Sequence, residues 1–275
     1  MVRKLGAAPA IAVTLIVRTL FVLVAMSVWP LAAAGGVLIV EKTVTGDAPA
    51  PTHQIQIDKD WMRMEHTLSG EKVAFVFDGA KQVMWIVNYD RKAYNEMTKA
   101  DVDRLGVQMS AAMAQMQEQI SRLPPDQRAM VEAATKGRGV TAGAPAKTVF
   151  RKAGTDTVGP WMCDKYEGYQ NNQKIAELCT VDPKALGFTA ADFEVSRQLA
   201  EFFQKMMPQN AENMFRLGAP DQQGFSGIPV RRVSLGQKQS VTELTDATRQ
   251  TFPDSVFELP AGFQKQALFG GRGGQ

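Results

Sequence analysis

Short apolar-rich segments, some of them alternating with polar residues as in His53–Ile57 and each bounded by turn-forming residues, fill the stretch from residue 37 to residue 89. Alternation with short turns predicts an antiparallel meander of strands. Two of the segments, Val73–Phe77 and Val83–Val87, are apolar at every position, which is typical of central strands whose second face is covered or contacts a ligand. The five predicted strands are Val37–Val44, His53–Ile57, Trp61–Leu68, Val73–Phe77 and Val83–Tyr89.

Two later stretches carry apolar residues at helical spacing. Thr98 and Thr189 are each followed by an aspartate three positions on, which is the pattern of a capped helix start. A third helix is predicted from Asp126 to Lys136, after two prolines that end the first. The apolar stripe of the first helix is Val102, Leu105, Met109, Met113, Met116 and Ile120, and that of the second is Val195, Leu199, Phe202, Phe203 and Met206.

More strands are predicted beyond the first helices. Strands interrupted by a few helices predict a single α+β domain over residues 35–266, with a large antiparallel sheet and helices laid against one face. The glycine-rich segment 267–275 is predicted to be a flexible tail. The additional strands are Trp161–Tyr169, Gln173–Val181, Ile228–Leu235, Gln239–Leu244 and Val256–Leu259.

Residues 1–34 have the layout of a secretory signal peptide. A positive region from Arg3 to Arg18 precedes the apolar run Thr19–Trp29, and Ala32-Ala33-Ala34 supplies the small residues that a signal peptidase recognises. The alternative is an N-terminal membrane anchor, but the apolar run is shorter than the ~20 residues that cross a bilayer. We therefore predict cleavage after Ala34, a periplasmic or secreted protein, and no membrane span after cleavage.

Export changes the interpretation of the two cysteines. Cys163 and Cys179 lie in two predicted strands that flank Gln170-Asn171-Asn172, and a turn centred on Asn171 places the cysteines directly opposite each other. That spacing suits a disulfide, and exported proteins meet an oxidising environment. We predict a cross-strand disulfide between Cys163 and Cys179; the alternative is a pair of buried free thiols.

Charge and composition exclude several function classes. The chain has 31 basic and 28 acidic residues, and removal of the leader, which holds three of the basic residues and no acidic ones, leaves a neutral domain. A neutral domain argues against nucleic acid as a partner, because nucleic-acid binding requires a clustered basic surface. With two histidines and two cysteines, the chain offers few groups for nucleophilic or metal chemistry.

Five strings along the chain carry a family resemblance: Trp61-Met-Arg-Met-Glu65, Phe77-Asp78-Gly79, Lys92-Ala-Tyr-Asn-Glu-Met97, Trp161-Met-Cys-Asp-Lys-Tyr-Glu-Gly168, and Phe252-Pro-Asp with Leu259-Pro-Ala-Gly-Phe263. They resemble an exported bacterial family, domain of unknown function family 4412, over most of residues 35–266. That family is similar in turn to periplasmic lipoprotein carriers of the LolA/LolB type. The resemblance implies an unclosed antiparallel half-barrel whose apolar concave face is capped by helices and receives acyl chains, and it implies no catalytic residue.

Candidate catalytic and metal sites are weak in this sequence. Gly224-Phe225-Ser226-Gly227 lacks the residue that a nucleophile elbow requires between serine and the second glycine, so we interpret it as a loop. His53 and His66 can face each other across neighbouring strands joined at Asp58–Trp61, but two histidines are too few for a structural zinc site. We predict no enzyme activity, no cofactor and no metal, with both histidines at the surface or partly buried.

The 14 methionines are the most unusual component of the composition. Three interpretations remain open: ordinary core packing, an adaptable apolar binding surface, or thioether coordination of Cu(I). The leading hypothesis is a non-enzymatic exported protein that binds a lipid, a lipoprotein acyl chain or another apolar partner. The alternatives are an interaction module without a ligand cavity, with an envelope protein as partner, and a copper-handling protein. The candidate ligand-lining residues are Phe75, Trp85, Met113, Met116, Phe202 and Met206.

The predicted cleavage can be tested on exported protein. Because Ala32-Ala33-Ala34 is the only small-residue run that follows the apolar segment directly, intact-mass analysis and Edman degradation should give an N-terminus at or near Gly35. An exported chain that retains Met1 and stays with the membrane would show that residues 1–34 form an anchor instead.

Overall fold

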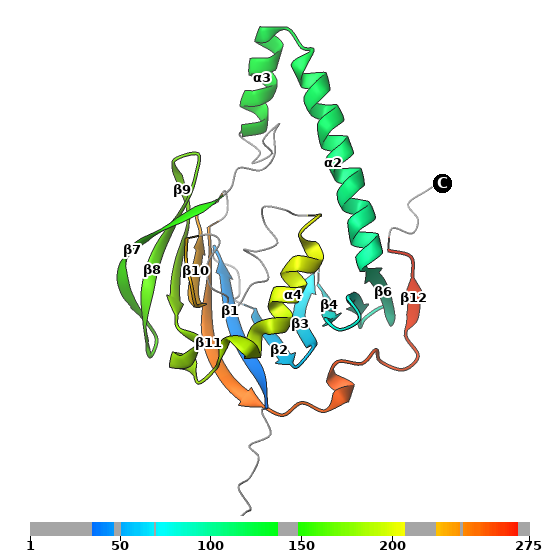
Figure 1. Cartoon of the computed structure of the whole chain (residues 1–275), viewed down its shortest axis with the longest axis vertical. Helices are drawn as coiled ribbons and strands as arrows, with labels where there is room; N and C mark the ends of the chain where they lie inside the picture. The colour runs from blue at the N-terminus through cyan, green and yellow to red at the C-terminus, as the bar shows by residue number, and fades with distance from the viewer. Residues whose placement is uncertain are drawn as a thin grey trace, which may run out of the picture. The chain divides into compact units, whose positions relative to one another are not determined.

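The computed structural model describes residues 35–46, 51–68, 70–136, 148–206, 224–236 and 239–268. They belong to one compact unit, Gly35–Gln275, which is built on a single large curved sheet (Figure 1). The predicted signal peptide, residues 1–34, and residues 269–275 of the predicted tail lie outside the described residues.

The sheet has twelve strands in the order β12-β6-β5-β4-β3-β2-β1-β11-β10-β9-β8-β7. Neighbouring strands are antiparallel, except that β12 pairs with β6 in parallel. The sheet is open, with β12 and β7 as its two edge strands. In chain order, the first six strands are β1 (Gly36–Thr45), β2 (Thr52–Asp58), β3 (Trp61–Leu68), β4 (Glu71–Asp78), β5 (Val83–Asn88) and β6 (Ala93–Thr98). The next six are β7 (Val149–Val158), β8 (Trp161–Gln170), β9 (Gln173–Val181), β10 (Ile228–Ser234), β11 (Ser240–Gln250) and β12 (Gln264–Gln266).

Along the chain, two helices lie between β6 and β7, and the third follows β9. They are α2 (Lys99–Ser121), α3 (Pro125–Lys136) and α4 (Glu194–Phe203), with short 3-10 turns η1 (Pro183–Leu186), η2 (Ala190–Phe193) and η3 (Asp254–Val256). Both predicted caps form: Asp101 accepts from the backbone N–H of Thr98 at 3.0 Å, and Asp192 accepts from that of Thr189 at 2.7 Å. The predicted second helix therefore begins as η2 and continues as α4.

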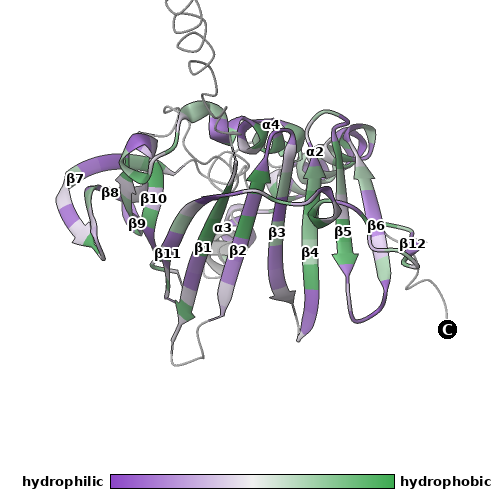
Figure 2. Cartoon of the chain, turned by 90° about the horizontal axis from the view of Figure 1, so that it is seen from below, coloured by the Kyte–Doolittle hydropathy of each residue, from purple (hydrophilic) through white to green (hydrophobic). Residues whose placement is uncertain are grey.

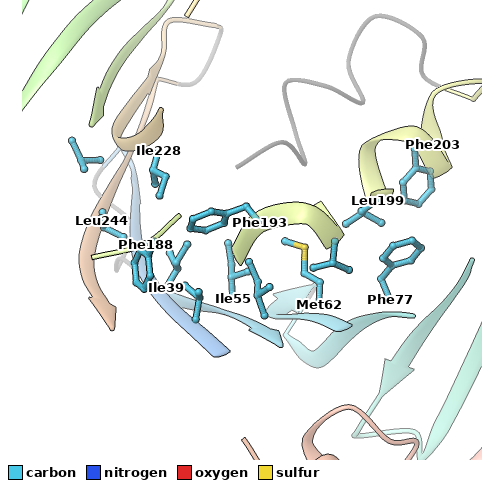
Figure 3. Close-up of a cluster of buried hydrophobic side chains, with 14 of the residues drawn as sticks. Ile39, Ile55, Met62, Phe77, Phe188, Phe193, Leu199, Phe203, Ile228 and Leu244 are labelled. Carbon is cyan, nitrogen blue, oxygen red and sulfur yellow. The ribbon is translucent and has the colours of Figure 1, made fainter. Parts of the chain in front are cut away.

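Helix α4 lies across the concave face of the sheet (Figure 3). Leu199 and Phe202 are fully buried, and the ring of Phe202 lies 5.3 Å from that of Phe77 on β4. These contacts form the centre of the main apolar cluster, which extends from β1 to β5 and into β9 and β10.

Helix α2 does not follow the sheet in the way its apolar stripe predicts. Its buried residues are Val102 and Gly106, both within the first three turns. A Cβ on Gly106 would lie 2.7 Å from the carbonyl oxygen of Lys205, so the glycine permits a close approach to the end of α4. Beyond that contact Met109 and Met116 are 46% and 37% exposed, and α2 and α3 form a hairpin that projects from the sheet (Figure 1).

The C-terminal segment covers the opposite, convex face of the sheet. Phe252 and Phe257 are buried there against Ala74, Val76 and Val87 of β4 and β5. This contact explains why both central strands are apolar on both faces (Figure 2). The predicted strand Val256–Leu259 is wrong, because its apolar residues are used in covering the sheet and not in pairing with it; the last strand is β12.

Arg63 of β3 attaches this C-terminal segment to the sheet. Arg63 is 6% exposed, and its guanidinium donates to the carbonyl oxygen of Val256 at 3.0 Å, to Glu65 at 2.6 Å and to the Tyr89 hydroxyl at 2.5 Å. A buried charge is tolerated only when it is paired and hydrogen-bonded in this way. The family-like strings at residues 61–65 and 252–263 therefore meet in three dimensions.

The predicted disulfide is present, but the predicted register of its hairpin is wrong. Cys163 and Cys179 are bonded, with their Cα atoms 5.4 Å apart, whereas the strand partner of Cys179 is Lys165. The turn consists of Asn171 and Asn172, both at positive φ, and is therefore not centred on Asn171 as predicted. An irregularity at Gly168/Tyr169 then shifts the pairing of the two strands by one further residue. The cysteines are thus offset by two residues along the ladder.

Loss of the disulfide should lower stability. Replacement of both Cys163 and Cys179 by serine frees a loop of about 15 residues, worth about 3 kcal/mol in the chain-entropy model. We expect a clear fall in the melting temperature under oxidising conditions, and little difference between the variant and wild type once both are in reducing buffer. Two titratable thiols in the native exported protein would contradict the bridge.

Candidate functional site

Cross-strand neighbours on the concave face form three rows that run across the sheet. The first row lies beneath α4, and each member is 8% exposed or less. Because successive members are direct strand partners, the row is a continuous apolar floor. Its members are Val37, Ile57, Met62, Phe77, Met84 and Met97.

The second row begins buried and ends partly exposed. Ile39 and Ile55 are 1% and 9% exposed, whereas Met64, Phe75 and Ile86 are only partly buried at the edge of the main cluster. Met64 pairs with Phe75, and Phe75 pairs with Ile86. We call Met64, Phe75 and Ile86 the apolar shelf, because they are three adjacent apolar side chains on the concave face with exposed area.

The third row is mostly polar and contains both histidines; its apolar member is Val73, the β4 partner of His66. The β2–β3 register, in which Gln54 pairs with Glu65, places His53 opposite His66, and the two rings lie 4.4 Å apart. The predicted opposition is therefore confirmed. Burial and the neighbouring His53 lower the pKa of His66, which favours the neutral form of this imidazole. The Nδ1 atom of His53 is buried and has no hydrogen-bond partner.

A partly buried ion pair continues the third row from β1 toward β10. Glu41 is the β1 partner of His53 and is 7% exposed. The guanidinium of Arg232 on β10 donates to both of its carboxylate oxygens, at 2.5 and 2.6 Å. The charge of Glu41 is thus neutralised within the sheet.

The predicted lining residues do not share one surface. Phe75 belongs to the shelf, Phe202 is fully buried under α4, and Met206 is partly buried against the main cluster. Met113 is partly buried on α2, and Met116 is 37% exposed.

Trp85 is a clear correction to the predicted lining. It lies on the convex face, where its ring stacks on Trp61 at 5.9 Å and its Nε1 donates to Glu96 at 3.2 Å. Successive side chains of a strand point to opposite faces of the sheet, so the side chain of Trp85 points away from the face that carries Ile86. Counting strand partners from Phe75 would have selected Met64 and Ile86, which sequence reasoning missed.

The remaining candidate sites have structural roles. The loop at residues 224–227 contributes Phe225, whose ring packs against those of Phe150 and Tyr166 at 5.0 and 6.2 Å. Among the described residues, no group of three or more His, Cys, Asp and Glu side chains could hold a metal ion. Likewise, none of the described helices is long and apolar enough to cross a membrane.

These observations define a class of protein that is built on one large open antiparallel sheet with few helices. The chain belongs to the family described as Domain of unknown function (DUF4412), whose model matches residues 99–263. The sequence resemblance to that family is therefore confirmed. No curated protein matches the sequence.

Two solved structures are similar to the chain at low identity. An uncharacterized conserved protein from Thermus thermophilus has 9% identity and a TM-score of 0.43, with 86% of this chain and 91% of that chain covered. A LolA superfamily protein from Nitrosomonas europaea has 10% identity and a TM-score of 0.26, with 81% of this chain and 88% of that chain covered.

Two methionines on the same strand test the difference between the first row and the shelf. Met62 is 1% exposed, so Met62→Ala should lower the free energy of unfolding by about 2–5 kcal/mol. Met64→Ala should lower it by less than ~2 kcal/mol, because the side chain is partly solvated already. Denaturant titration of the two variants measures both values, and equal losses would show that Met64 is core rather than surface.

Proposed function

We propose that this chain is an exported, non-enzymatic protein that binds an acyl chain or another flexible apolar ligand on the apolar shelf. The observation that carries the proposal is the placement of Met64, Phe75 and Ile86. Three adjacent strands present them in one row with exposed area, between a fully buried row and a polar row.

The dimensions and chemistry of the shelf suit an elongated apolar ligand. Neighbouring strands lie about 4.8 Å apart, so three strands give an apolar band about 10 Å across. Methionine adapts to irregular apolar partners because it is unbranched and polarizable. Met64 lies within the band, and Met206, at the end of the α4 segment, packs against the same cluster.

The polar third row supports an amphiphilic ligand. A tail on the shelf would leave its head group near His53, His66 and the Glu41–Arg232 pair, which can exchange hydrogen bonds with polar atoms. The LolA/LolB-type resemblance of the sequence supports the same ligand class. The signal-peptide layout of residues 1–34 and the Cys163–Cys179 disulfide fit an exported protein.

An interaction module without a bound ligand is the second candidate. It is favoured by the packing of α4, where Leu199 and Phe202 are completely buried and the ring of Phe202 contacts that of Phe77 on the sheet. Because α4 is tightly packed, a ligand would lie beside this helix on the shelf and not beneath it. The shelf variants below distinguish the two candidates.

Charge placed on the shelf should abolish ligand binding. Phe75→Glu puts a carboxylate in the middle of the row, where contact with an apolar ligand would desolvate it at a cost of several kcal/mol. We expect wild type to bind a fluorescent fatty-acid probe saturably and the variant to lose this binding. Met162→Glu is the matched control, because Met162 is 78% exposed on β8, outside the shelf.

Circular dichroism and the melting temperature establish that each variant is folded before the titration. If wild type binds no probe, or if Phe75→Glu and Met162→Glu bind it equally well, the shelf is not a ligand site. The interaction module is then the function that the structure supports.

A further inference from the structure

The only two histidines of the chain lie opposite each other on β2 and β3, one position beyond the Gln54–Glu65 pair. Their rings lie 4.4 Å apart and are inclined by 39°, so the two imidazoles are in direct contact. We propose that His53 and His66, with the thioether of Met64, form a binding site for Cu(I). This site shares Met64 with the apolar shelf and adjoins the proposed ligand there, but it does not depend on ligand binding at the shelf.

One ring nitrogen of the pair is left without a hydrogen-bond partner in the described part of the protein. The buried Nδ1 of His53 lacks a hydrogen-bond partner, and such an atom is destabilising unless something binds it. Aromatic contact at 6.2 Å places Phe75 edge-on to His66, on the side of the shelf. An apolar neighbour of this kind excludes water from the imidazoles without supplying a competing hydrogen bond.

The surrounding charges favour an ion that needs few ligands and no carboxylate. Glu41, the nearest acid along the row, is occupied by both hydrogen bonds from Arg232. Zinc in structural sites takes four protein ligands, and Ca²⁺ and Mg²⁺ take oxygen ligands. Neither set exists at this pair among the residues that the structure describes.

Met64 supplies the third donor and the preference for Cu(I). It precedes His66 by two residues on β3, so both side chains emerge on the concave face. It is partly buried and has the flexibility of an unbranched side chain. Thioether sulfur selects Cu(I) over the harder divalent ions, and imidazole is compatible with it.

Cu(I) titration of the tag-free mature chain tests the site directly. The protein competes anaerobically with bicinchoninate for Cu(I), with ascorbate present, and the loss of the coloured complex reports binding. We expect one tightly bound Cu(I) per chain, and at least about tenfold weaker binding in His53→Gln, His66→Gln and Met64→Leu, since even the loss of an outer-sphere partner has effects of that size. The control Met109→Leu/Met116→Leu, in the exposed stripe of α2, should bind like wild type.

Footprinting of wild type keeps the test independent of variant folding. Diethyl pyrocarbonate modifies accessible imidazoles, and mass spectrometry locates the product at two sites only, since the chain has two histidines. Cu(I) should protect His53 and His66 together. Absence of protection, or Cu(I) binding that survives both histidine substitutions but is lost in the α2 control, would overturn the proposal and indicate a different, methionine-based site.

Discussion

The alternation of side chains along β3, β4 and β5 makes both faces of the central sheet apolar, and both faces therefore need a cover. Phe77 and Met84 point to one face, while Val76 and Val87 point to the other. Leaving either face in water would expose several large side chains, each worth about 1.5–3 kcal/mol on burial. The rest of the chain is arranged to supply these two covers: α4 on the concave face and the C-terminal segment on the convex face.

The convex cover is specific because its apolar contacts are combined with one buried charge. Phe252 and Phe257 fit against the sheet, but apolar contact alone sets no register for an extended segment. Arg63 sets it, since its guanidinium reaches the Val256 carbonyl while Glu65 and Tyr89 satisfy its other donors. Strand β12 then follows, paired with β6, and Lys265 forms an ion pair with Glu96. The C-terminal segment held in this way is a structural part of the fold.

Local structure could be predicted well from the sequence, but which distant segment covers each face of the sheet could not. Caps at Thr98 and Thr189, the meander β1–β5, the histidine register and the disulfide follow from local patterns. Strand β7 was not predicted, because most of its residues are exposed and lack alternation. Trp85 was assigned to the ligand surface because bulk and hydrophobicity do not reveal which face of a strand is covered by which distant segment. Similarly, the α2 stripe resembles a core-facing stripe, yet its packing ends where Gly106 meets α4.

The shelf is a consequence of the size of the concave cover. A helix that lies across strands covers a band about 10 Å wide, whereas a strand of eight residues, such as β3, is about 26 Å long. One transverse helix therefore buries the row through Met62 and Phe77 and only begins to cover the next. Where its cover ends, Met64, Phe75 and Ile86 are still apolar. One row further, His53, His66 and Glu41 are polar, and Val73 on β4 remains apolar. These three side chains of the shelf pack against the main cluster on one side and keep exposed area on the other, and this exposed apolar area beyond the covering helix is the reason for proposing ligand binding there.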